Sequence, residues 1–267
     1  MSPTSSIDTA ESPLQMERDG AIVTLRFNRP KALNAIDIPI ALAFLQAVRE
    51  LAADRSVRAI VLCGTGRGFM AGGDLATMRA DPQQGARELI GPLHEAITIL
   101  AGMDAPLIAK VHGVAAGAGL SLMLQADFVI AAEGTRFSLA YVNIGTSCDV
   151  GASWSLPRLV GLRRSLEIAM LGETLSCEEA LRLGLINRVA PAAELDAEVE
   201  AFARRLAGGP TVAFGRLRRL MRESFGRDLP AQLDAEAAAF LECAASDDFK
   251  TGIDAFFAKQ PAQFAGR

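Results

Sequence analysis

Apolar and polar residues in this chain of 267 residues repeat first with a period of two and then with the period of an α-helix. Strict alternation on both sides of Asp19-Gly20 predicts a β-hairpin, because an Asp-Gly pair adopts the turn that joins antiparallel strands. Apolar strand-like runs then alternate with helical segments, which is the pattern of an α/β fold. The predicted strands are 14–18, 21–27, 58–63, 106–111, 128–131 and 136–138, and the predicted helices are 37–54, 75–79, 83–101, 120–126, 162–171 and 176–183.

From residue 193 onward the pattern predicts helices only, over 194–206, 211–225, 229–245 and 249–259. We therefore expect a loose tail over 1–13, an α/β core over 14–192 and an all-helical C-terminal region over 193–267. The tail is rich in Ser, Thr and Pro and lacks the charged and apolar segments of a signal peptide. The basic run 216–222 is expected to be a solvated helix face, and a phosphate-binding patch is the alternative.

Composition narrows the classes of function. Half of the residues are hydrophobic, and the net charge of -4 argues against nucleic acid as a partner. The longest apolar run, 111–126, is short and broken by glycine, so we expect a buried core element and no membrane contact. Four scattered cysteines without C-x-x-C spacing predict free thiols and no metal site, as in a cytoplasmic protein.

Two stretches of small residues are the candidate ligand-binding elements. His112-Gly-Val-Ala-Ala-Gly-Ala-Gly119 joins a predicted strand to a helix, where exposed backbone N–H groups favour negative charge. The alternative is a tightly packed turn without a ligand. Ala71-Gly-Gly-Asp-Leu75 forms a second tight turn, in which we interpret Asp74 as a helix cap. Gly64-Thr-Gly-Arg-Gly68 is not a dinucleotide fingerprint, because Phe69 stands where glycine or alanine is required.

Four motifs occur in a characteristic order. They are Asn28-Arg-Pro-Lys-Ala-Leu-Asn34, Phe69-Met-Ala-Gly-Gly-Asp-Leu75, His112-Gly-Val-Ala-Ala-Gly-Ala-Gly119 and Ala180-Leu-Arg-Leu-Gly-Leu-Ile186. Together they make the chain resemble the enoyl-CoA hydratase/isomerase, or crotonase, family from residue 14 to the end. The resemblance implies a crotonase-type spiral of strand-strand-helix units and a helical tail that forms a homo-trimer or hexamer. It also implies an acyl-CoA thioester as the substrate, with no further cofactor.

The resemblance assigns roles to individual residues. The backbone N–H groups of Gly73 and Ala118 match the pair that holds the thioester oxygen, which agrees with the two small-residue turns. Five further residues match positions that contact CoA in relatives: Lys31, Ala32, Leu33, Ala71 and Leu75. Two more, Phe256 and Lys259, match positions that contact CoA across a subunit boundary.

Departures from the family pattern point to the reaction. Hydratases of this family activate water with two glutamates, whose positions hold Ser121 and Tyr141 here, so the usual hydration mechanism lacks both acid/base groups. We interpret Tyr141 as a wall of the substrate pocket. Asp149 stands where many enoyl-CoA isomerases carry aspartate, and one carboxylate is enough to move a proton from C2 to C4. The other role open to Asp149 is the N-cap of a helix over 150–160.

Two alternatives to the isomerase stay open. In 4-chlorobenzoyl-CoA dehalogenases of this family, an aspartate at the Asp149 position attacks the ring and a histidine at the His94 position activates water. A lone histidine on a helix margin is otherwise a packed or surface residue. The second alternative is a non-catalytic CoA-binding or interaction protein on the same fold.

Overall fold

The computed structural model describes residues 12–267, so most of the predicted tail, residues 1–11, lies outside the described part of the chain. The side-chain amide of Asn28 donates to the carbonyl of Ser12 (3.0 Å), and its backbone N–H donates to the carbonyl of Pro13 (2.8 Å). The boundaries of the three predicted parts stay predictions.

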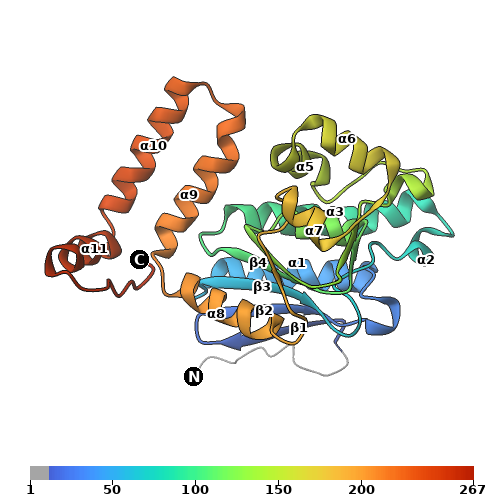
Figure 1. Cartoon of the computed structure of the whole chain (residues 1–267), viewed down its shortest axis with the longest axis horizontal. Coiled ribbons are helices and arrows are strands. Elements are labelled where there is room, and N and C mark those ends of the chain that lie inside the picture. The colour runs from blue at the N-terminus through green and yellow to red at the C-terminus, as the bar shows by residue number, and fades with distance from the viewer. Residues whose placement is uncertain (1–11) are drawn as a thin grey trace.

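A six-stranded sheet forms the centre of the fold (Figure 1). Its strands in spatial order are β1 (Leu14–Asp19), β2 (Ile22–Phe27), β3 (Ala59–Gly64), β4 (Leu107–Val111), β6 (Phe128–Ala132) and β9 (Arg188–Ala190). β1 and β2 pair antiparallel as the predicted hairpin, and all the other neighbours pair in parallel. Parallel neighbours need crossover connections, and helices supply most of them here, as expected of an α/β core.

Three short strands form a second sheet, β5 (Val114–Ala116), β7 (Arg136–Ser138) and β8 (Thr174–Leu175). β5 lies inside the small-residue stretch 112–119, which we expected to be a turn. The hydrophobic pattern missed β5, β8 and β9 because two or three residues are too few to show alternation. β5 leads directly into α4 (Ala118–Met123), which ends three residues before the predicted boundary at 126.

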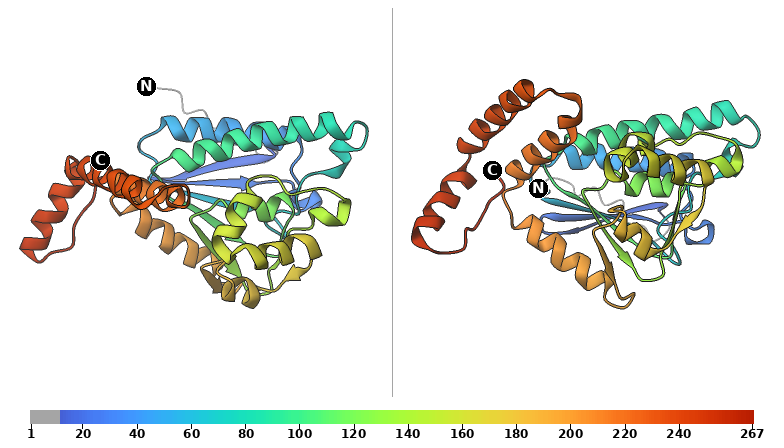
Figure 2. Two further views of the ribbon diagram at one scale, coloured as in Figure 1. Left: turned by 90° about the horizontal axis from the view of Figure 1, so that it is seen from above. Right: turned by 45° about the horizontal axis from the view of Figure 1, so that its top comes forward.

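Helices cover both faces of the large sheet (Figure 2). Successive side chains of β3 point to opposite faces of the sheet. Ile60 and Leu62 belong to the main core under α1 (Ile38–Ala53), whereas Val61 packs under α8 (Leu195–Ala207) on the other face. The prediction that Asp74 caps a helix is confirmed at α2 (Leu75–Met78). Asp37 caps α1, and Ser176 forms a capping box with Glu179. The helices of the core are α1 (Ile38–Ala53), α2 (Leu75–Met78), α3 (Pro82–Gly102), α5 (Ala152–Val160), α6 (Leu162–Leu171), α7 (Cys177–Arg182) and α8 (Leu195–Ala207).

The last three helices form an arm that projects from this body: α9 (Thr211–Glu223), α10 (Leu229–Ala244) and α11 (Asp247–Ala258) (Figures 1 and 2). α8 packs on the sheet instead, so the helical region has a core part and a projecting part. Large apolar side chains of the arm are exposed, among them Phe240 (63%), Leu241 (69%) and Phe256 (76%).

Both interpretations of the basic run 216–222 are wrong, because three of its four arginines tie the arm to the body and the fourth pairs within the arm. Arg218 is almost buried, with 8% of its side chain exposed, and its Nε lies 2.7 Å from Asp127. Arg222 lies 2.9 Å from the other oxygen of Asp127, and Arg219 lies 2.7 Å from Asp104. Arg216 pairs with Glu242, so each of these guanidinium groups already has a carboxylate partner.

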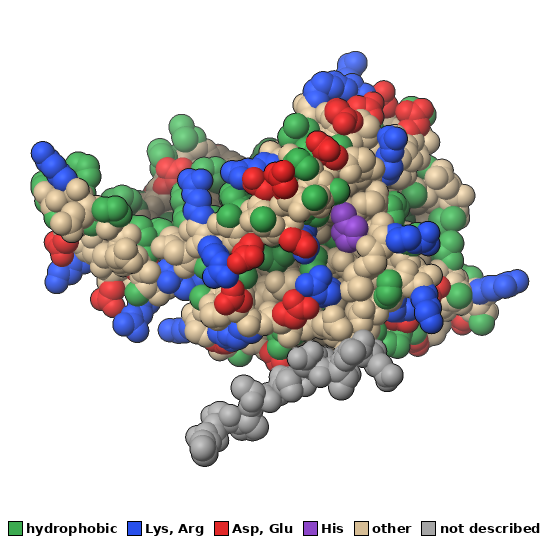
Figure 3. All heavy atoms as spheres, turned by 60° about the horizontal axis from the view of Figure 1, so that its bottom comes forward, with side chains coloured by type: hydrophobic (Ala, Val, Ile, Leu, Met, Phe, Trp, Pro, Cys, Tyr) green, Lys and Arg blue, Asp and Glu red, His purple; other side chains and the backbone are tan. Residues whose placement is uncertain are grey.

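The outer surface carries mixed charges. Figure 3 shows acidic and basic side chains interspersed on one face, without a continuous basic field. In the described part of the chain, no helix combines the length and apolar character needed to cross a membrane. Cys63, Cys148, Cys177 and Cys243 are all free thiols.

Candidate functional site

A cavity of about 450 Å³ lies between α3, the two small-residue stretches and the segment 140–149. Its wall is mostly apolar, and Asp149 is the only carboxylate among the described residues that line it. Beside Thr146 and Ser147, which the sequence did not single out, the cavity is lined in part by groups that the sequence did single out. They belong to Ala71, Gly73, Leu75, His94, Ala118, Tyr141 and Asp149.

The two small-residue stretches meet through their backbones. A Cβ placed on Gly72 would lie 3.6 Å from the amide nitrogen of Ala118, and a Cβ on Gly119 would lie only 2.4 Å from the carbonyl oxygen of Met70. This contact therefore requires glycine at 119. Ala118 is the first residue of α4, so its N–H has no partner within the helix, and no described group accepts from the N–H of Gly73. Two backbone donors without a partner among the described groups thus belong to residues that line one cavity, and an oxyanion site needs such a pair.

Asp149 does not cap a helix. α5 begins at Ala152 with Gly151 as its N-cap, so the capping alternative is wrong. Between them, Val150 is fully buried with a φ of 53°, a left-handed conformation that a β-branched residue rarely adopts. The positive φ of Val150 and Gly151 turns the chain out of the cavity wall before the helix starts, which leaves the Asp149 side chain in the cavity.

A short chain of hydrogen bonds leads from Ser121 through Tyr141 to the Asp149 carboxylate. The phenol of Tyr141 donates to Oδ1 of Asp149, and the hydroxyl of Ser121 lies 3.0 Å from the phenol oxygen. Tyr141 is therefore more than the pocket wall that the sequence indicated. Burial and the charge of Asp149 raise the pKa of the Tyr141 phenol well above its usual value, so it stays a hydrogen-bond donor at physiological pH.

His94 and Gln125 hold the strained residue beside Asp149. Nε2 of His94 accepts a hydrogen bond from the N–H of Val150 (3.2 Å), and Nε2 of Gln125 donates to the carbonyl of Val150 (3.0 Å). Gln125 is itself held by Ser155, whose hydroxyl lies 3.2 Å from Oε1. Since Nε2 of His94 is an acceptor here, the neutral ring carries its proton on Nδ1.

The sequence pattern gave no indication of the hydrogen bonds that hold Val150, because Gln125 and Val150 belong to no recognisable motif. It also missed Asn34, which is fully buried and left-handed, with a φ of 57°. Its side-chain amide donates to the carbonyls of Thr65 (2.9 Å) and Gly68 (2.8 Å). Its place at the end of the motif 28–34 was the available signal.

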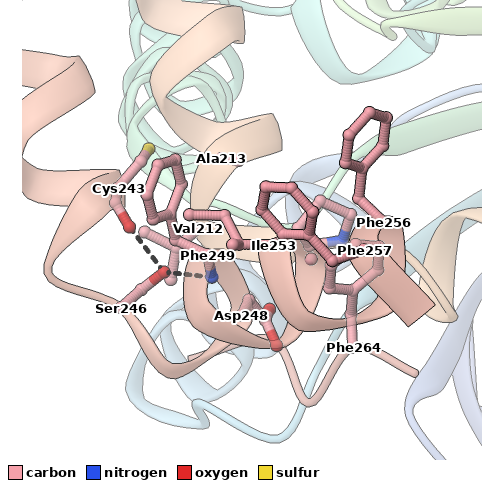
Figure 4. Close-up of a pocket in the computed structure, with 12 residues that line it drawn as sticks. Val212, Ala213, Cys243, Ser246, Asp248, Phe249, Ile253, Phe256, Phe257 and Phe264 are labelled. Carbon is pink, nitrogen blue, oxygen red and sulfur yellow. Dashed lines mark hydrogen bonds between the residues drawn. The ribbon is translucent and has the colours of Figure 1, made fainter. Parts of the chain in front are cut away.

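The predicted CoA-binding residues fall into two groups. Leu33 borders the site, because its carbonyl accepts from the N–H of Ala71 (3.0 Å), and Lys31 and Ala32 precede it in a short 3-10 turn. Phe256 and Lys259 belong to the arm. Phe256 lines a separate apolar cavity of about 350 Å³ between α9 and α11 (Figure 4), so one chain does not bring it to Asp149.

No group of three His, Cys, Asp or Glu side chains within residues 12–267 is arranged to hold a metal ion. The arrangement around Asp149 instead offers a base and two fixed dipoles. A carboxylate can accept a proton from a substrate carbon while backbone N–H groups stabilise the negative charge that develops on a neighbouring oxygen.

The sequence pattern of the family described as enoyl-CoA hydratase/isomerase matches residues 17–267. The chain is 38% identical to a "probable enoyl-CoA hydratase" of Rhodobacter capsulatus and 35% identical to 1,2-epoxyphenylacetyl-CoA isomerase of Escherichia coli; each match covers 92% of this chain and 95% of the relative. The crystal structure of an enoyl-CoA hydratase from Mycobacterium smegmatis superposes with a TM-score of 0.89 at 32% identity, over 95% of this chain and 99% of that one.

Proposed function

Because this chain belongs to the enoyl-CoA hydratase/isomerase family, whose members act on acyl-CoA substrates, we propose that it shifts the double bond of an enoyl-CoA with Asp149 as its single base. One observation carries the proposal. Asp149 is the only carboxylate among the described residues lining a cavity into which the unpaired N–H groups of Gly73 and Ala118 also face.

The proposed reaction moves one proton. Asp149 removes it from C2 of a 3-enoyl-CoA: the C–H bond breaks, an O–H bond forms on the carboxyl group, and the electron pair spreads onto the thioester oxygen. The N–H groups of Gly73 and Ala118 stabilise that oxygen, since fixed dipoles need no reorganisation when the charge develops. The same carboxyl group returns the proton at C4 and leaves the 2-enoyl product.

Hydration of the usual kind is disfavoured although several relatives are named hydratases. The resemblance places the two water-activating glutamates at Ser121 and Tyr141. A hydroxyl is not a base near neutral pH, and the raised pKa of Tyr141 makes the phenol a still poorer proton donor to C2 of the substrate. Dehalogenation is disfavoured because the Nε2 lone pair of His94 is engaged by the N–H of Val150.

The test is an assay of 3-hexenoyl-CoA with wild type, Asp149→Asn and the control Glu133→Gln, which changes an exposed carboxylate to an amide in the turn after β6. We expect wild type and control to form 2-hexenoyl-CoA equally. Loss of a general base typically costs about 10²- to 10⁴-fold in rate, and we expect Asp149→Asn to fall in that range. Isomerisation that survives in Asp149→Asn would overturn the mechanism.

Two further substrates separate the alternatives. Rapid formation of 3-hydroxyhexanoyl-CoA from 2-hexenoyl-CoA would identify a hydratase, and chloride release from 4-chlorobenzoyl-CoA would identify a dehalogenase. Binding of all three thioesters without turnover would identify a non-catalytic CoA-binding protein.

We also propose that the chain assembles into a homo-trimer or hexamer through the arm. The exposed apolar side chains of α10 and α11 support this, because such surface is normally buried against a partner. In that assembly Phe256 and Lys259 would reach the CoA of a neighbouring subunit. The four free thiols are compatible with the predicted cytoplasmic location, and no cofactor beyond the CoA substrate is required.

A further inference from the structure

The hydroxyl of Ser121 has two acceptors and one hydrogen. Its Oγ lies 3.0 Å from the phenol oxygen of Tyr141 and 3.2 Å from the carbonyl oxygen of Gly117. Ser121 is fully buried and does not line the cavity, so substrate does not compete for this hydrogen. At any moment the hydroxyl can donate fully to only one of the two oxygens.

Each acceptor is linked to a group that is negatively charged at a different stage of the proposed reaction. Tyr141 donates to Asp149, the group that is negatively charged before the substrate reacts. Gly117 contributes its carbonyl to the same peptide unit that carries the N–H of Ala118, one of the two donors to the thioester oxygen. That oxygen is the negatively charged group after the proton has moved.

Charge at each end changes the strength of the corresponding acceptor. While Asp149 is ionised, donation by Tyr141 to the carboxylate makes the phenol oxygen electron-rich, which favours the hydrogen of Ser121 there. Once Asp149 is protonated and the oxyanion forms, the peptide unit of Gly117 and Ala118 is polarised by the charge on its N–H side. Its carbonyl then becomes the stronger acceptor.

We propose that the Ser121 hydroxyl is a two-position switch that follows the negative charge from Asp149 to the thioester oxygen, and that Ser121 and Tyr141 are positioning residues that couple the base to the oxyanion site. The inference deepens the proposed isomerase and rests on it. No O–H bond of Ser121 or Tyr141 breaks, because the serine hydroxyl only rotates. Donation to Gly117 strengthens the Ala118 N–H in the intermediate and not before.

The kinetic effect can be bounded. An oxyanion-hole donor is worth about 10²- to 10³-fold in rate, and a cooperative neighbour strengthens a hydrogen bond by roughly 10–30%. Ser121→Ala should therefore lower kcat by about two- to eightfold with KM little changed. The matched control is Ser165→Ala, since Ser165 is also buried and donates to the carbonyl four residues before it, Gly161 (2.7 Å), outside the cavity.

A spectroscopic test needs no turnover. The thioester C=O stretch of bound hexanoyl-CoA reports the strength of the Ala118 donor, and Asp149→Asn imitates the protonated base because it removes the charge. We expect Ser121→Ala to leave the stretch almost unchanged in wild type. In the Asp149→Asn background it should raise the frequency, because only there does Ser121 donate to Gly117.

Outcomes distinguish this inference from the proposed function. An equal shift from Ser121→Ala in both backgrounds, or none in either, overturns the switch while isomerisation by wild type keeps the proposed function. Hexanoyl-CoA that fails to bind, or wild type that fails to isomerise 3-hexenoyl-CoA, overturns the proposed function and the switch with it. The Ser165→Ala control should reproduce the wild-type frequency in both backgrounds.

Discussion

His94 should support Asp149 through the backbone and not as a base. Its Nε2 accepts from the N–H of Val150, the left-handed residue that follows Asp149. Replacing His94 by leucine leaves this buried N–H without an acceptor, whereas glutamine can place its side-chain oxygen near the position of Nε2. The two substitutions therefore separate a hydrogen-bond role from imidazole chemistry.

The magnitude follows from the contacts. An unsatisfied buried N–H costs about 1–3 kcal/mol, and the left-handed φ of Val150 already stores strain of about 1–3 kcal/mol that only its surroundings maintain. In a protein of this size, His94→Leu should lower the melting temperature by about 2–12 °C. If Val150 relaxes, Asp149 shifts, and a displacement of about 1 Å can cost roughly 100-fold in rate.

The assay is the kcat for 3-hexenoyl-CoA together with a thermal melt, for His94→Leu, His94→Gln and the control His112→Gln. His112 is the other histidine of the sequence; its ring contacts the carbonyl of Gly66 (2.8 Å) and does not line the cavity. We expect His94→Leu to lose about 10- to 100-fold, and His94→Gln and the control to stay within about threefold of wild type. A folded His94→Gln as inactive as His94→Leu would show that the imidazole itself takes part in the reaction, and it would contradict a purely supporting role for His94.

Two further predictions concern stability and assembly. Asp127→Asn leaves the buried Arg218 without its charged partner, at a cost in stability of about 3–5 kcal/mol, and should therefore lower the melting temperature by about 6–20 °C. Asp104→Asn removes a more exposed pair with Arg219 and should lower the stability by less than about 1 kcal/mol. Equal losses in the two variants would contradict the distinction between buried and exposed pairs. Replacing Leu241 by Glu should convert the proposed oligomer to a smaller species by light scattering, and an unchanged mass would exclude this face of α10 from the interface.

Local patterns were enough to predict most of the fold. Long periodic segments such as α1 and α6 lie within one or two residues of their predicted limits, because their apolar residues repeat often enough to define one face. The arginines of α9 could not be interpreted in this way. Asp127, the partner of Arg218 and Arg222, lies about 90 positions earlier in the sequence. An amphipathic pattern does not predict which distant carboxylate will pack against a basic helix.

The role of Asp149 was undecided in the sequence for a related reason. An aspartate just before a helical segment fits an N-cap. Nothing in the residue types showed that the helix begins at Ala152, two residues after the predicted start at 150. The delay depends on the left-handed conformation of Val150, which His94 and Gln125 maintain from other helices or turns. Tertiary contacts therefore excluded the cap.

The absence of the two glutamates and the presence of Asp149 are physically connected. The phenol of Tyr141 is within hydrogen-bonding distance of the Asp149 carboxylate, so a carboxylate near the position of that phenol would place two like charges side by side. Two such groups cannot both be ionised near neutral pH at low cost, and one would take up a proton. A phenol and a serine hydroxyl avoid this conflict, because the phenol donates to the charged Asp149, the serine hydroxyl contacts the phenol, and neither carries a charge. This arrangement supports the proposed transfer of a single proton over the activation of water between two carboxylates.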